Sequence, residues 1–195
     1  HETKSNYSIR VQVTDENNAS YEKVFAISVT DVNEVPVITS PTSGDAVPDK
    51  MWDKRFGGSL NDYCNKIIST SDGGYLLVGT SESTAGGDKS ESSRGGADYW
   101  AVKVDAIGNR HWDKRFGGSG NDECKDVVAT FDGGYLLVGY SQSPVGGDKS
   151  EGSRGSNDYW VVKIDSNGNK VWDKRFGGDG NDQCFSIVPT AANDG

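Results

Sequence analysis

The sequence predicts an all-β protein built largely from repeated sheets, and three observations support this fold class. The string WDKRFGG begins at Trp52, Trp112 and Trp172, so most of the chain repeats every 60 residues. Short runs rich in β-branched and aromatic residues lie between clusters of Gly, Asn and Asp. The 26 glycines, 5 tryptophans and 8 tyrosines suit short strands joined by tight turns better than long helices.

Each full copy of the repeat is expected to hold four strands that form one sheet. In the second copy these strands are expected over residues 111–116, 124–130, 135–141 and 159–165. The turns DGG at 132–134 and NGN at 167–169 supply the positive backbone dihedrals that tight hairpins need. Neighbouring strands should therefore be antiparallel.

Two of the expected strands are continuous apolar runs, Leu136–Val138 and Tyr159–Val162. Such runs indicate strands that are covered on both faces by neighbouring sheets, and stacked four-stranded sheets describe a β-propeller. The sequence holds two full copies, 52–111 and 112–171, and part of a third, 172–195. Propellers usually have about 4 to 8 blades. We therefore expect an incomplete propeller, an open arc with one exposed sheet face, and further blades in a longer polypeptide.

The first 36 residues lie outside this repeat. Polar and apolar residues alternate over 7–13 and 24–29, which predicts a hairpin of two half-buried strands that Pro36 terminates. Residues 37–51 contain two prolines and show no periodicity, as is typical of a linker. The domain boundary is therefore expected within 37–51.

Two family resemblances extend this reading. The segments GGSGND, DGGYLLVGYS and YWVVKID occur in order in the second copy. They resemble the propeller repeats, about 60 residues long, of bacterial secreted and surface proteins, and this resemblance covers 52–195. The segments HE, YSIRVQVTD and DVNEVP are similar to the last third of a cadherin-type domain, where LDRE, YxLxVxAxD and DxNDNxP follow one another. This second resemblance implies the end of a β-sandwich over 1–36.

The cadherin-type resemblance also implies a Ca²⁺ site at the junction with the next domain. Its implied ligands are Glu2, Asp15, Asp31, Asn33 and Glu34. Ca²⁺ prefers several hard oxygen ligands, and carboxylates gathered at one end of a sandwich would repel one another without a cation. The alternative for the same residues is an acidic strand end that is solvated and binds no metal.

Charge and hydropathy exclude two classes of partner. The 29 acidic residues outnumber the 20 basic ones and give a net charge of −9, which disfavours a nucleic-acid phosphate backbone. No stretch approaches the roughly 20 apolar residues of a membrane-spanning helix. We therefore expect neither a nucleic-acid partner nor a membrane-spanning segment.

The residues that could carry chemistry recur with the repeat. Cys64, Cys124 and Cys184 occupy equivalent places, so we expect small buried residues that are too far apart for disulfides. His111 corresponds to Met51 and Val171, which argues against a catalytic base. An acid present in every copy is expected to accept backbone hydrogen bonds in turns, and we predict no catalytic residues. The paired acids are Asp62 and Asp122, Asp72 and Asp132, Asp88 and Asp148, Glu91 and Glu151, and Asp98 and Asp158.

Function is expected to lie in the loops. Residues 86–97 and 146–157 are long, polar and nearly identical, and loops on a rigid scaffold are frequent binding sites. Asp88, Ser90 and Ser92 place oxygens at alternate positions, a weak signal for Ca²⁺ that Gly152 breaks in the second copy. The sequence predicts a non-enzymatic, calcium-dependent adhesion or binding module, extracellular or on a cell surface, whose loops bind protein or glycan. The alternatives are a fragment of a secreted propeller hydrolase that acts on glycans, and a purely structural spacer.

Overall fold

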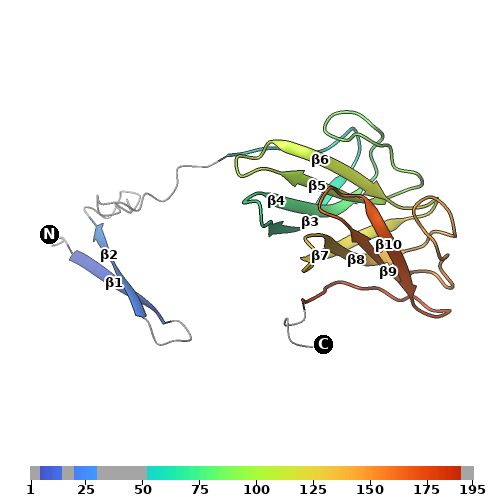
Figure 1. The fold of residues 1–195 in the computed structure, drawn as a ribbon. Helices are drawn as coiled ribbons and strands as arrows, with labels where there is room; N and C mark the ends of the chain where they lie inside the picture. Colours follow the sequence, from blue (N-terminus) through green and yellow to red (C-terminus); the bar gives the residue numbers. More distant parts are fainter. Residues whose placement is uncertain (1–4, 15–19, 30–51, 190–195) are drawn as a thin grey trace. The chain divides into compact units, whose positions relative to one another are not determined.

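The computed structural model describes residues 52–189 and, before them, two strands over 5–14 and 20–29. The chain divides into two compact units, residues 1–51 and 52–195. All ten strands are shown in Figure 1, and the described residues contain no helix, which confirms the all-β class. Accordingly, no membrane-spanning helix is found among the described residues.

The first unit contains one antiparallel hairpin in its described part. Strands β1 (Ser5–Thr14) and β2 (Ser20–Val29) pair in a register that joins Ser5 to Val29 and Thr14 to Ser20. Both strands include the runs in which polar and apolar residues alternate. The rest of the expected cadherin-like sandwich stays a prediction.

The second unit contains two four-stranded antiparallel sheets with the same strand order. Sheet I consists of β3 (Asp62–Ser69), β4 (Tyr75–Ser81), β5 (Asp98–Val104) and β6 (Arg110–Phe116). Sheet II consists of β7 (Asp122–Ala129), β8 (Tyr135–Ser141), β9 (Asp158–Ile164) and β10 (Lys170–Phe176). Each sheet is a simple meander, as the turn chemistry predicts.

The sheets do not begin where the sequence copies begin, which corrects one expectation. The strand expected over 111–116 was assigned to the sheet of the second copy, but it lies in β6, which pairs with β5 in sheet I. The turn between them is a tight hairpin, in which Gly108 has a φ of 78° and the Asp105 amide donates to the Asn109 carbonyl. Each sheet therefore takes its fourth strand from the start of the following copy.

The two sheets pack face to face around a shared apolar core. Tyr99 of β5 lies against Trp160 of β9, with ring centroids 4.8 Å apart, and its hydroxyl donates to the Trp160 carbonyl at 2.9 Å. Strand β7 contacts β3, β4 and β5 of the other sheet, and Figure 1 shows the two sheets as adjacent layers. The buried core residues are Leu76, Val78, Tyr99, Ala101, Phe116, Cys124, Val127, Tyr135, Leu137, Trp160, Val162 and Ile164.

Burial on both faces is complete for β5 and incomplete for β9. Every residue of β5 is buried, because sheet II covers one face while Trp52 and Phe56 pack on the other. In β9 the run Tyr159–Val162 is buried on one face only, and Tyr159 is 39% exposed. The expectation for Tyr159–Val162 is therefore wrong for its outward residues, since no described sheet packs there.

Candidate functional site

The candidate site is formed by the two long loops at the strand ends of the sheets. Residues 86–97 lie between β4 and β5, and residues 146–157 lie between β8 and β9. A buried lysine anchors each loop from beneath. Lys89 is 3% exposed and donates from Nζ to the Ser83 carbonyl at 3.1 Å and to Ser93 Oγ at 3.0 Å. Lys149, also 3% exposed, donates to Ser141 Oγ at 2.6 Å. Burial lowers the pKa of both lysines.

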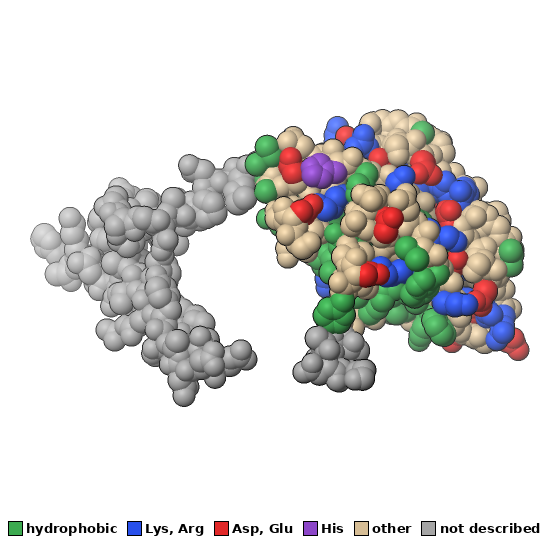
Figure 2. All heavy atoms as spheres, viewed as in Figure 1, with side chains coloured by type: hydrophobic (Ala, Val, Ile, Leu, Met, Phe, Trp, Pro, Cys, Tyr) green, Lys and Arg blue, Asp and Glu red, His purple; other side chains and the backbone are tan. Residues whose placement is uncertain are grey.

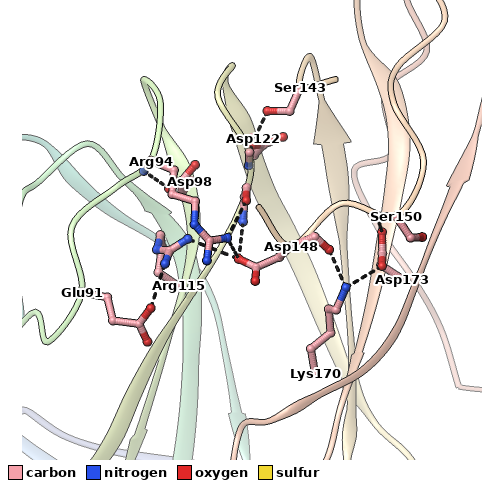
Figure 3. A network of polar contacts seen from close by, with 12 residues as sticks. Glu91, Arg94, Asp98, Arg115, Asp122, Ser143, Asp148, Ser150, Lys170 and Asp173 are labelled. Atoms are coloured by element: carbon pink, nitrogen blue, oxygen red, sulfur yellow. Dashed lines mark hydrogen bonds and ion pairs between the residues drawn. The ribbon is translucent and has the colours of Figure 1, made fainter. Parts of the chain in front are cut away.

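A network of charged groups joins the two loops across the boundary between the sheets (Figure 3). Asp148 of the second loop is its centre. Asp148 Oδ2 accepts from Arg94 Nη1 at 2.5 Å, from Arg115 Nη1 at 3.2 Å and from the Gly117 amide at 3.2 Å. Arg115 also binds Glu91 Oε2 at 2.8 Å. One carboxylate thus ties Arg94 of the first loop and Arg115 of β6 to the second loop.

Buried carboxylates lie behind this network. Asp98 and Asp122 are fully buried, and each has one side-chain oxygen, Oδ1, without a hydrogen-bond partner among the described residues. Asp98 Oδ2 accepts from the Arg94 amide at 2.6 Å. Burial, helped by the nearby charge of Asp122, raises the pKa of Asp98 to about 6.

Other acids that recur with the repeat hold turns and strands together. Asp72 Oδ2 binds Lys103 Nζ at 2.7 Å, and this contact holds the pKa of Asp72 well below its usual range. Asp113 Oδ2 accepts from Trp100 Nε1 at 3.1 Å and from the Ser90 amide at 2.9 Å. Matching contacts recur in sheet II between Lys163 and Asp132 and between Trp160 and Asp173.

The weak calcium pattern in the first loop serves hydrogen bonds. Asp88 Oδ2 accepts from the Gly57 amide at 3.2 Å, and Ser92 Oγ accepts from the Ala85 amide at 2.9 Å. Among the described residues, no group of three or more His, Cys, Asp or Glu side chains could hold a metal ion. The five implied ligands of the first unit, Glu2, Asp15, Asp31, Asn33 and Glu34, lie outside the described residues.

The cysteines differ in burial although they occupy equivalent positions of the repeat. All three cysteines are free thiols, but only Cys124 is buried, while Cys184 is half-buried and Cys64 is exposed. The expectation of three buried cysteines is therefore correct for Cys124 alone, because sheet I covers that position. His111 is exposed on β6 and appears purple in Figure 2.

Sequence reasoning missed an apolar pocket on the outer face of sheet I. The pocket has a volume of about 190 Å³, and its lining includes Phe56, Cys64, Ile67, Leu77 and Trp100. The equivalent face of sheet II is filled by sheet I, with Val127 and Trp160 buried in the shared core. Ile67 of the pocket is 53% exposed, whereas the equivalent Val127 is buried in the shared core.

No protein-family model matches the chain, and no curated protein matches it.

Proposed function

We propose that the chain is a non-enzymatic, calcium-dependent binding module of a cell surface, and that its two polar loops bind protein or glycan. The anchoring of two near-identical loops by buried lysines supports this proposal most directly. A loop held by Lys89 or Lys149 loses little conformational entropy on binding, and its exposed tip stays free for a partner.

The hydrogen bonding of the recurring acids supports the same proposal. Catalysis by a pair of acids requires two carboxylates whose environments differ. Asp72 and Asp132 bind lysines, and Asp113 and Asp173 bind tryptophans, in the same way in both sheets. Such contacts stabilise turns and strands and leave recognition to the loops.

Binding by the loops is tested on a printed glycan array and on immobilised bacterial surface protein. Val145→Glu changes a residue just before the second loop that is 68% exposed, and should weaken binding. Phe131→Glu is the matched control, because Phe131 is 83% exposed on the turn before β8. Equal binding by wild type and Val145→Glu would exclude this loop as the contact surface.

Calcium dependence is tested by thermal unfolding with CaCl₂ and with a chelator. An ion that binds only the folded chain raises the midpoint temperature of unfolding. At a concentration of 100 times Kd it increases the free energy of unfolding by about 2.7 kcal/mol. Asp31→Ala with Glu34→Ala should abolish the shift, whereas Asp45→Ala, an acid of the linker outside the motif, should retain it. Superimposed curves for the wild type would remove calcium from the proposal.

A further inference from the structure

A polar pocket lies between sheets I and II, where β3 and β7 begin and β4 ends. Its volume is about 360 Å³, which is within the range of small-molecule binding sites. Both walls of the pocket belong to described strands and to the residues beside them. The lining residues that carry polar side chains are Tyr63, Asn65, Thr80, Glu82, Glu123 and Lys125.

Thr80 of β4 supplies the observation that points to a ligand. It pairs with Tyr63 of β3 and with Tyr99 of β5, and Tyr99 packs against sheet II. Residues paired across antiparallel strands share a face, so Thr80 faces the space between the sheets. The residue is 4% exposed, and its Oγ1 has no hydrogen-bond partner among the described residues. A buried hydroxyl without a partner is costly, and a hydrogen-bonding ligand in the pocket removes that cost.

The two copies of the repeat differ at the polar positions of the pocket. In the second copy, the residues equivalent to Tyr63, Asn65, Thr80 and Glu82 are Glu123, Lys125, Tyr140 and Gln142. Residues beside them are identical in both copies, namely Asp62, Cys64, Gly79, Ser81 and Ser83. Residues that only hold a sheet together meet the same demands in both copies. The difference is therefore expected of side chains that contact a ligand.

The charges of the lining favour a neutral ligand. Lys125 Nζ donates to Glu123 Oε2 at 2.8 Å, and Asn61 Nδ2 donates to Glu82 Oε2 at 3.1 Å. The lining thus carries two carboxylates and one ammonium group, so a charged ligand of either sign would meet a like charge. A neutral ligand with several hydroxyls can donate to the carboxylates and accept from Lys125.

We propose that this pocket binds one neutral sugar residue of a glycan. The sugar hydroxyls bond to Thr80, Glu82 and Lys125, and its C–H groups lie on the ring of Tyr63, which is 55% exposed. Ala97, the last residue of the first loop, also lines the pocket. The proposal deepens the function proposed above, because it assigns the glycan a subsite at the base of this loop, and it rests on the glycan form of that function.

The first experiment follows the backbone amide signals of the full chain by NMR during titration with three neutral glycosides. The probes are methyl β-D-glucopyranoside, methyl β-D-galactopyranoside and methyl α-D-mannopyranoside. Saturable shifts of Thr80, Glu82 and Glu123 are expected with at least one of them. Glucosamine and glucuronate, a cation and an anion, should bind about tenfold more weakly. No saturable shift with any neutral glycoside, or equal binding of a charged sugar, would overturn the proposal.

The second experiment removes the unpartnered hydroxyl. Thr80→Val should weaken binding of the same glycoside about tenfold and should not lower the midpoint temperature of unfolding, because Oγ1 has no partner among the described residues. Ser69→Ala is the matched control, since it removes a hydroxyl of β3 outside the lining and Ala129 is its equivalent in the second copy. A purely structural hydroxyl would give the reverse result, a lower midpoint with unchanged binding, and would overturn the proposal.

A second variant and the loop variant separate this proposal from the function on which it rests. Glu82→Gln should also weaken binding, and it is expected to fold because Gln142 is the equivalent residue of the second copy. Val145 is not among the residues that line the pocket, so Val145→Glu tests the second loop alone. Loss of glycoside binding in Thr80→Val but not in Val145→Glu supports the pocket. Loss in Val145→Glu alone would refute the pocket and retain the loop.

Discussion

Asp98 shows how one side chain at the start of β5 couples stability to pH. The residue is fully buried, and burial disfavours its charged form more than the nearby Arg115 and Lys89 favour it. The pKa is about 6 in the folded chain against 3.8 when exposed. Ionised Asp98 therefore weakens the fold above pH 6, and this penalty disappears as the pH falls below 4.

Asp98→Asn is expected to remove this penalty. The amide oxygen can still accept from the Arg94 amide, and the uncharged side chain is no longer repelled by the nearby negative charge of Asp122. The variant should be more stable than the wild type by roughly 2 to 3 kcal/mol at pH 7, with the difference vanishing near pH 4. Urea unfolding at both pH values measures it. A variant less stable at pH 7 would contradict the assignment.

The three thiols should react in an order set by their neighbours. Cys124 lies in the shared core, and burial holds its thiol pKa far above the usual range, whereas Cys64 lies on a face that no described sheet covers. Iodoacetamide should modify Cys64 and Cys184 in the native chain and Cys124 only after unfolding. Mass spectrometry of the digested protein reads the order. Native modification of Cys124 would contradict the packing of the sheets.

At the scale of elements, the strands β3 and β7 share an irregularity that fixes their curvature. The register shifts between Cys124 and Asp126, which leaves Lys125 as the bulged residue, opposite Gly139 and Val138 of β8. The same shift occurs in β3. A Cβ added at Gly139 would lie 1.9 Å from the Glu123 carbonyl oxygen, so the two backbones approach too closely for a side chain.

Gly139→Ala is therefore expected to destabilise the chain by roughly 1 to 3 kcal/mol, through the displacement of β7 from β8. Gly178→Ala is the matched control, because nothing lies within 4 Å of its added Cβ. Chemical denaturation of both variants measures the difference. A Gly139→Ala variant as stable as the control would show that β7 can shift without loss of packing.

At the scale of the whole unit, the two sheets share one core and should unfold together. Tyr99 of sheet I is fully buried against Trp160 of sheet II, whereas its counterpart Tyr159 is 39% exposed. Loss of this contact should weaken β4 and β8 to the same extent, because neither sheet buries its inner face alone.

Tyr99→Ala is expected to reduce stability by about 3 to 5 kcal/mol, and Tyr159→Ala by less than about 1 kcal/mol. Hydrogen exchange should show amide protection falling in β4 and β8 together in the first variant. Loss of protection confined to sheet I would mean that the sheets fold independently.

The strands and turns were predictable from the sequence because their signals are local. The glycines of the DGG turns have nearly equal φ values, 81° at Gly73 and 80° at Gly133, as the turn chemistry requires. Each strand of the second copy was predicted to within a few residues. The 60-residue period, however, does not show at which residue each sheet begins. The pairing of β6 with β5 could therefore not be derived from it.

The sequence by itself determined the all-β class, the 60-residue repeat and the antiparallel hairpins. Only the tertiary structure decided which of two identical residues is buried and where each sheet begins. The physical reason is that turn and strand preferences depend on a few neighbouring residues. Burial and charge pairing depend instead on whether another sheet lies across the face, which the repeated sequence does not encode.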